Sequence, residues 1–236
     1  MGKDKLKRFA ENETFSNLYQ PQFPEVFRKD FHLKGKWNIE VFKNNNPIVL
    51  ELGCGRCEYT IGMGRFNPDK NYIGIDIKGA RLWRGAKTAT EDKMSHIAFI
   101  RTNIELLGSF FAQNEVSEIW ITFPDPQLKV RRAKKRLTGS LLLNQYKKVL
   151  NETGTINLKT DSAELFQYTN ELLNFNQITP IKNIADIYAS EEITDLLKIK
   201  THYESIFLKV GKPINYLQFA LPDKEIIELP NEEIEE

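Results

Sequence analysis

The residues best suited to chemistry stand at the ends of short apolar runs in the first half of the chain. The run at 48–52 contains Glu51, and the loop Gly53-Cys54-Gly55 that follows lets the backbone approach a ligand closely at Gly53 and Gly55. A dinucleotide-binding loop would carry a third glycine at the position of Glu58. An acid there disfavours a pyrophosphate and favours a cation. The loop therefore favours S-adenosylmethionine (SAM), which has a sulfonium and an ammonium group but no phosphate, over NAD, with an ordinary tight turn as the alternative.

Polar side chains also follow the next three apolar runs. Asp76 lies 25 residues after Glu51, where an acid accepts hydrogen bonds from ribose hydroxyls, and Asn103 could bind an adenine edge through its amide. Either residue could instead cap a helix. Asp125 lies in the segment Phe123-Pro124-Asp125-Pro126, where a helix cap between two prolines is less natural. The corresponding strand end of a class I methyltransferase faces the methyl group, so Asp125 is the candidate catalytic residue.

A run of cations comes directly after this candidate site. Six of eight consecutive residues are basic, namely Lys129, Arg131, Arg132, Lys134, Lys135 and Arg136. A solvated loop is the usual explanation of such a run. Its position beside the candidate methyl-transfer site favours the neutralisation of phosphates in a nucleic acid.

The charge of the whole chain hides an asymmetry. The formal net charge is +1, but residues 223–236 contain seven acidic residues and one lysine. Without that tail, 32 basic residues stand against 25 acidic ones, and a basic body suits a polyanionic partner.

The two cysteines, Cys54 and Cys57, predict no disulfide framework, and only three histidines accompany them as zinc ligands. We therefore expect no bound metal. The charged N-terminus lacks the apolar stretch of a secretory signal, and no apolar run reaches the ~18 residues that span a bilayer. The protein is accordingly expected in the cytoplasm and away from membranes, while a monomer and a homodimer both stay open.

These residues need a scaffold that brings several strand ends together. Apolar runs at 48–52, 72–77, 97–100, 118–123 and 155–159 predict strands, and they alternate with predicted helices at 59–66, 80–93, 104–111, 140–150 and 163–175. This alternation predicts an α/β fold with a mostly parallel sheet and helices on both faces. Residues 205–210 and 214–219 predict a terminal antiparallel hairpin. We expect an N-terminal arm at 1–46, a methyltransferase domain at 47–221, and a disordered acidic tail at 222–236.

Five motifs, taken in order, resemble the bacterial tRNA (guanine-N7-)-methyltransferases. They are Val49-Leu50-Glu51-Leu52-Gly53-Cys54-Gly55, Gly74-Ile75-Asp76-Ile77, Phe123-Pro124-Asp125-Pro126, Lys159-Thr160-Asp161 and Thr201-His202-Tyr203-Glu204. The resemblance covers about residues 49–219. It implies a Rossmann-like class I methyltransferase fold. It also implies transfer of a methyl group from SAM to N7 of the variable-loop guanine at tRNA position 46, which gives 7-methylguanosine.

The resemblance also implies roles for individual residues. The SAM-binding set would be Glu51, Gly53, Gly55, Asp76, Asn103 and Asp125. The set that binds the guanine or the tRNA beside it would be Lys129, Asp161, Thr201, His202, Tyr203 and Glu204, with phosphate contacts from Arg131, Arg132, Lys134, Lys135 and Arg136. The chain departs from the family in two places. Gln127-Leu128 replaces the usual Trp-Pro after Asp125-Pro126, and Asp76 stands where the family often has Glu.

Carboxylates suit methylation at guanine N7, which carries a lone pair and needs no general base. Asp125 and Asp161 could accept hydrogen bonds from guanine N1–H and its amine, although Asp161 could instead cap the helix at 163–175. Three other functions stay open: a SAM enzyme for a protein or small molecule, an NAD-dependent oxidoreductase, and a non-catalytic RNA-binding protein. The basic run and Lys159-Thr160-Asp161 disfavour the first, and Glu58 disfavours the second. The intact acids Glu51, Asp76 and Asp125 disfavour the third.

Overall fold

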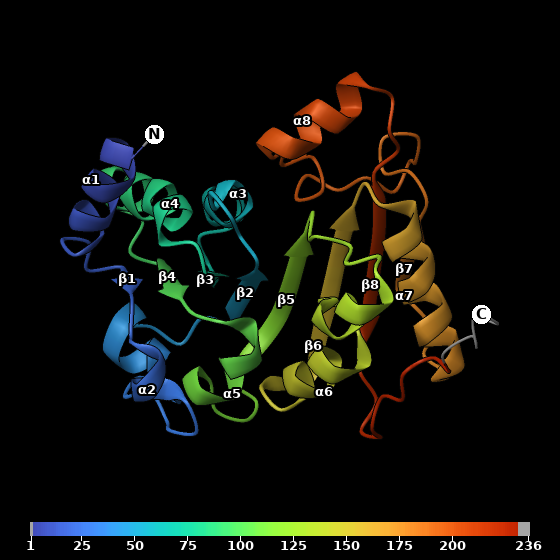
Figure 1. Cartoon of the computed structure of the whole chain (residues 1–236), viewed down its shortest axis with the longest axis horizontal. Helices are drawn as coiled ribbons and strands as arrows, with labels where there is room; N and C mark the ends of the chain where they lie inside the picture. The colour runs from blue at the N-terminus through green and yellow to red at the C-terminus, as the bar shows by residue number, and fades with distance from the viewer. Residues whose placement is uncertain (1, 231–236) are drawn as a thin grey trace.

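The computed structural model describes residues 2–230 (Figure 1). The strands are β1 (Leu18–Tyr19), β2 (Ile48–Leu52), β3 (Asn71–Asp76), β4 (Ile97–Arg101), β5 (Val116–Thr122), β6 (Leu150–Thr160), β7 (Lys182–Ile184) and β8 (Asn215–Ala220). The helices are α1 (Gly2–Asn12), α2 (Phe23–Val26), α3 (Glu58–Phe66), α4 (Gly79–Glu91), α5 (Leu107–Phe110), α6 (Ser140–Lys147), α7 (Ala163–Phe175) and α8 (His202–Lys209). Three further helical segments are η1 (Trp37–Phe42), η2 (Ile104–Leu106) and η3 (Val130–Lys135). Residues 231–236, the last part of the acidic tail, lie outside the described residues.

The described strands form one eight-stranded sheet in the order β1-β4-β3-β2-β5-β6-β8-β7. Neighbouring strands from β1 to β6 pair in parallel, whereas β8 runs antiparallel to both β6 and β7. The chain winds outward through β3 and β4 on one side of β2 and through β5 and β6 on the other. The strand order therefore reverses between β2 and β5, which is where α/β sheets bind ligands. The mostly parallel sheet with an antiparallel end is confirmed.

Helices cover both faces of the sheet because the strands are apolar on both sides. Leu50 and Leu52 belong to a buried cluster with residues of η1, α5, α6 and α7, while Val49 belongs to a second cluster with residues of α3 and α4. Successive side chains of a strand point to opposite faces, which explains this division. All five residues of β2 are buried, as expected for a central strand of a parallel sheet.

One predicted strand is wrong, because residues 205–210 fall mostly within helix α8. The Thr201 hydroxyl accepts a hydrogen bond from the Glu204 amide at 3.1 Å, and the Glu204 carboxylate accepts one from the Thr201 amide at 3.3 Å. This reciprocal capping box fixes the start of a helix, so the apolar residues that follow continue the helix and do not form a strand. The strand that pairs with β8 at the edge of the sheet is β7 instead.

Segments near both ends of the chain pack on this core. In the N-terminal segment, β1 adds an edge strand beside β4, and α1 lies against α4 (Figure 1). Near the other end, the Asn144 side chain bonds both the amide and the carbonyl of Ile226 at 2.9 Å, and Ile226 is buried. Asn176 bonds the amide and carbonyl of Ile227 at 2.8 Å. The tail expected to be disordered is therefore packed as far as Leu229.

Candidate active site

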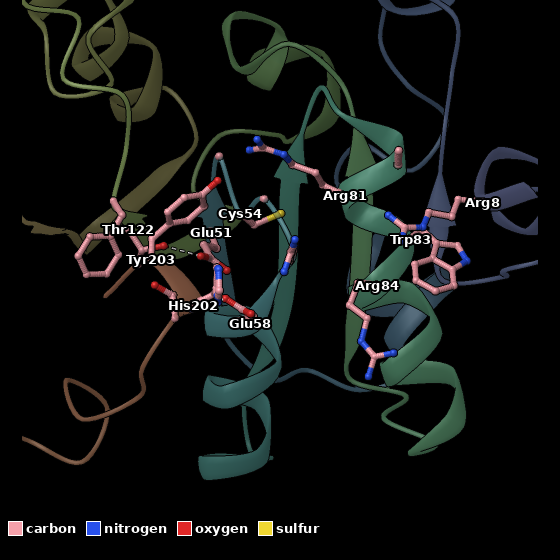
Figure 2. A pocket seen from close by; sticks show the side chains of 16 residues that line it. Arg8, Glu51, Cys54, Glu58, Arg81, Trp83, Arg84, Thr122, His202 and Tyr203 are labelled. Atoms are coloured by element: carbon pink, nitrogen blue, oxygen red, sulfur yellow. Dashed lines mark hydrogen bonds between the residues drawn. The ribbon is translucent and has the colours of Figure 1, made fainter. Parts of the chain in front are cut away.

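A cavity of about 560 Å³ opens at the carboxyl end of the sheet, where the strand order reverses between β2 and β5 (Figure 2). Glu51 of β2, Thr122 of β5 and the loop after β2 lie at its base. Residues from the first turns of α4 lie across the cavity from His202 and Tyr203 at the start of α8 (Figure 2). Segments that are far apart in the sequence thus meet at one edge of the sheet, as the parallel topology predicts.

Glu51 is the most deeply buried acid of the cavity, with 1% of its surface exposed. One carboxylate oxygen accepts hydrogen bonds from the Thr60 amide at 2.7 Å and from the Thr60 hydroxyl, and the other accepts one from the Thr122 hydroxyl at 2.5 Å. Burial raises the pKa of Glu51 to about 7, although these hydrogen bonds oppose the shift. A cation placed beside Glu51 would favour its ionised form.

Gly53 and Gly55 adopt the left-handed backbone that glycine favours, with φ of +73° and +55°. Asp76 supports this loop, since its carboxylate accepts hydrogen bonds from the Gly55 amide at 2.9 Å and from the Lys78 amide at 2.7 Å. Asp76 is 8% exposed and lies behind the loop that lines the cavity. Asn103 stands at the start of η2 and makes no capping hydrogen bond through its side chain. The ribose and adenine roles of Asp76 and Asn103 stay predictions.

Asp125 stands exposed on a constrained loop beyond β5. Phe123 and Gln127, which bracket it, have left-handed φ angles of +48° and +50°, and such backbone costs about 1–2 kcal/mol per residue outside glycine. The loop is held in this form at two points. The Phe123 amide donates to the Lys159 carbonyl at 2.8 Å, and the Gln127 amide donates to the Asp125 carboxylate at 3.1 Å. Among the described residues, Asp125 caps no helix and its second carboxylate oxygen makes no hydrogen bond, so that oxygen can bind a ligand.

The basic run folds largely into η3, and five of its six cations, Lys129, Arg131, Arg132, Lys134 and Lys135, are exposed. Arg136 differs from them. Its guanidinium lies 4.2 Å from the ring centre of Tyr168, and its Nε donates to the Gln127 carbonyl at 3.3 Å. Arg136 thus supports the Asp125 loop through Nε, and the predicted phosphate contact at Arg136 stays a prediction.

Asp161 is not the cap of α7. The neighbouring Ser162 fills that place, since its hydroxyl accepts a hydrogen bond from the Leu165 amide at 3.2 Å. The Asp161 carboxylate instead pairs with Lys212 at 3.0 Å, and the Lys212 ammonium also lies 5.1 Å from the ring centre of Phe207. Asp161 is partly exposed and remains available to a guanine that displaces the lysine.

The segment Thr201-His202-Tyr203-Glu204 divides into two parts. His202 and Tyr203 are exposed and line the cavity, and the His202 amide donates to the Glu58 carboxylate at 2.7 Å. Glu204 is fully buried, so the prediction that it contacts the guanine directly is wrong for this conformation. Thr201 is 9% exposed and lines the cavity, but its hydroxyl is committed to the helix cap.

Glu204 is buried because Lys159 lies against it. The Lys159 ammonium pairs with the Glu204 carboxylate at 2.8 Å and donates to the carbonyls of Leu197 and Ile199 at 2.8 and 3.0 Å. The Tyr188 hydroxyl donates to the same oxygen of this carboxylate at 2.8 Å, and the Lys159 ammonium also donates to the other oxygen at 2.9 Å. Burial lowers the pKa of Lys159 to about 8, and Glu204 opposes that shift. Lys159 therefore joins β6 to the segment that carries His202 and Tyr203 over the cavity.

Cys54 and Cys57 are free thiols with their sulfur atoms 3.4 Å apart. Burial raises the pKa of both thiols. Within residues 2–230, no group of three or more Cys, His, Asp or Glu side chains could hold a metal ion. In the same part of the chain, no helix is long and apolar enough to cross a membrane.

Comparison with known proteins connects this geometry to a family. A family model described as a putative methyltransferase matches residues 45–217. A tRNA (guanine-N(7)-)-methyltransferase of Christiangramia forsetii is 53% identical over 93% of this chain and 98% of that protein. The enzyme of the same name from Bacteroides fragilis is 48% identical over 100% of this chain and 92% of that protein. One from Listeria monocytogenes is 35% identical over 84% of this chain and 91% of that protein.

Solved structures agree with this in their fold. The 16S rRNA methyltransferase KamB aligns with a TM-score of 0.59 and 13% identity, over 78% of this chain and 92% of KamB. An antibiotic-related methyltransferase aligns with a TM-score of 0.58 and 18% identity, over 81% of this chain and 95% of that structure. At these identities the likeness establishes a shared class I methyltransferase fold.

Proposed function

Because this chain belongs to the family of tRNA (guanine-N(7)-)-methyltransferases, we propose that it methylates N7 of the variable-loop guanine at tRNA position 46 with SAM as the donor. The observation that carries the proposal is the arrangement of charge at one edge of the sheet. A buried carboxylate suited to a cation lies at the base of the cavity, and the exposed cations around η3 stand on the segment just beyond β5. A tRNA substrate would place the protein in the cytoplasm.

The cavity suits SAM through the chemistry of its donors. Glu51 offers a desolvated carboxylate to a positive charge, and the left-handed Gly53 and Gly55 let the loop approach the ligand without side chains. Asp76 and Asn103 are the candidates for the ribose and the adenine. When bound, SAM supplies an electrophilic methyl group on a sulfonium.

The protein's own residues would orient the guanine and stabilise its developing charge. N7 attacks through its lone pair, and the base becomes cationic without loss of a proton. Asp125 and Asp161 would accept hydrogen bonds from guanine N1–H and its exocyclic amine, and their negative charge would favour the cationic product. Lys212 must leave Asp161 for this contact to form. Residues 47–221 would carry this chemistry, with 1–46 as an arm beside it and 222–236 as a tail.

Methyl transfer from labelled SAM to bulk tRNA, followed by nucleoside analysis, tests the proposal. The expected product is 7-methylguanosine, and methylation of another base or another guanine atom would exclude it.

The affinity for SAM is expected to rise as the pH increases through about 7, the pKa of Glu51. Below that pH Glu51 is mostly protonated, and above it the carboxylate attracts the cofactor's positive charge. Since the pKa is raised from its ordinary value of 4.5, Glu51 stabilises the ligand-free fold below 4.5, and this contribution is lost as the pH rises through 7. Calorimetric titration of SAM across this range should show the rise, and Glu51→Gln should flatten it. A pH dependence that Glu51→Gln leaves intact would assign it to another group.

The variant Lys129→Ala plus Arg132→Ala is expected to weaken tRNA binding and reduce its salt dependence. Both side chains are exposed, and each phosphate contact contributes about 0.7–0.9 to the slope of log affinity against log salt concentration. Binding of tRNA over a series of salt concentrations measures the slope. A double variant with the wild-type slope would show that the basic run does not contact tRNA.

A further inference from the structure

Four arginines, Arg8, Arg56, Arg81 and Arg84, line the cavity. They come from α1, from the loop after β2 and from the first two turns of α4. Arg8, Arg81 and Arg84 lie on the side of the cavity opposite His202 and Tyr203 (Figure 2). All four side chains are exposed.

These cations differ from their neighbours in how they are paired. On the same helix Lys87 pairs with Glu11 at 2.8 Å and with Glu91 at 3.9 Å, and on α3 Arg65 pairs with Asp92. Within the described part of the chain, the four cavity arginines make no ion pair. Lys87 and Arg65 are thus neutralised locally, while the four arginines that line the cavity keep their charge unpaired.

SAM does not account for so many unpaired cations. It carries two positive charges and one carboxylate, so it can neutralise the charge of at most one of these arginines. The acids of the cavity do not neutralise them either. The Glu51 carboxylate is buried and accepts hydrogen bonds from Thr60 and Thr122, and the Glu58 carboxylate accepts a hydrogen bond from the His202 amide. Arg8, Arg81 and Arg84 form a rim of positive charge along one side of the cavity. Such a rim suits a polyanion that reaches the mouth of the cavity.

The packing of α1 on α4 keeps the rim in place. The Trp83 indole donates to Glu11 of α1 at 2.7 Å, and the Arg8 guanidinium lies 4.8 Å from a Trp83 ring centre. The rim and η3 also lie on opposite sides of β2, because α4 follows β3 and η3 follows β5 in a sheet ordered β3-β2-β5. Both follow the carboxyl ends of their strands, so cations flank the cavity on two sides.

We propose that Arg81 and Arg84 bind phosphates of the tRNA backbone on the side of the cavity opposite η3, so that the strand carrying the target guanine is held on both sides. This inference rests on the proposed function and adds a second tRNA-binding surface to it. The basic run after β5 is the first.

The test is tRNA binding by the variant Arg81→Gln plus Arg84→Gln over a series of salt concentrations. Two lost phosphate contacts should reduce the slope of log affinity against log salt by about 1–2 and the affinity near physiological salt roughly tenfold. The charge-conserving variant Arg81→Lys plus Arg84→Lys should keep most of the slope. A control is Lys147→Gln plus Lys148→Gln at the end of α6, just before the amino end of β6, which should leave the slope unchanged.

SAM binding, measured by calorimetry on the same variants, shows whether the arginines bind the phosphates of tRNA or bind SAM. The inference predicts SAM affinity within about twofold of the wild type. A wild-type salt slope in Arg81→Gln plus Arg84→Gln would overturn it, as would a loss of SAM affinity with tRNA binding intact. Failure of the proposed function would look different, since the wild-type protein itself would then form no 7-methylguanosine.

Discussion

Replacing Asp125 by asparagine is expected to lower kcat for methyl transfer by about 100-fold or more, because the variant loses a negative charge aimed at a base that becomes cationic. The loop itself should be kept. Asparagine retains an oxygen that can accept the hydrogen bond from the Gln127 amide, now at 3.1 Å. Asp125 is exposed and makes no other described side-chain contact, so the stability of the fold should stay within about 0.5 kcal/mol. Single-turnover transfer from labelled SAM measures the chemical step directly.

The matched control is Asp30→Asn, an exposed acid that pairs only with Lys34 on the surface. It should leave kcat and the affinity for tRNA unchanged. If Asp125→Asn kept kcat within threefold of the wild type, a catalytic role for this carboxylate would be excluded. If it changed only the KM for tRNA, Asp125 would hold the substrate without favouring the transition state.

Breaking the buried pair between Lys159 and Glu204 is expected to have the largest effect on stability. Both side chains are 0% exposed, and removing one leaves the other charge buried without its partner, which costs about 3–5 kcal/mol. Glu204→Ala should therefore lower the free energy of unfolding by an amount in this range. It should also reduce activity in the fraction that remains folded, since His202 and Tyr203 directly precede Glu204. Urea unfolding followed by circular dichroism measures the first effect.

Two controls make this prediction specific. Asp30→Ala breaks a surface pair with Lys34, and such pairs contribute at most about 1 kcal/mol. Lys159→Met plus Glu204→Leu removes both charges together and should recover much of the stability lost in either single variant. A loss below 1 kcal/mol in Glu204→Ala would show that the pair does not hold this wall of the cavity.

Much of the fold could be predicted because its signals are local. Short apolar runs alternating with helical segments predicted the parallel sheet, and the parallel topology explains why Glu51, Asp76 and the Asp125 loop lie near one edge. The prediction of a strand at 205–210 was wrong, and the reason for this is also local. Its apolar residues suit either element, and the decisive signal was the capping box formed by Thr201 and Glu204 just before them.

Long-range contacts were beyond the reach of sequence patterns. Lys159 and Glu204 are 45 residues apart, and only folding makes them a buried pair. In the sequence Arg136 does not differ from its exposed neighbours, because its contact with the Tyr168 ring forms only in the folded chain. No sequence pattern distinguishes Arg81 and Arg84 from other surface cations, because their place at the cavity depends on how α4 follows β3. One sequence feature indicates that Lys159 is unusual, namely that this lysine stands near the end of an apolar strand.

The most direct test of the central claim uses a tRNA assembled with 7-deazaguanine at the variable-loop position. This base keeps the pairing edge of guanine but replaces N7 by carbon, so the nucleophilic lone pair is absent. Methyl transfer from labelled SAM to the unmodified tRNA is expected and none to the 7-deazaguanine tRNA, with both binding equally well. Transfer to the 7-deazaguanine tRNA at the rate of the unmodified one would contradict the central claim.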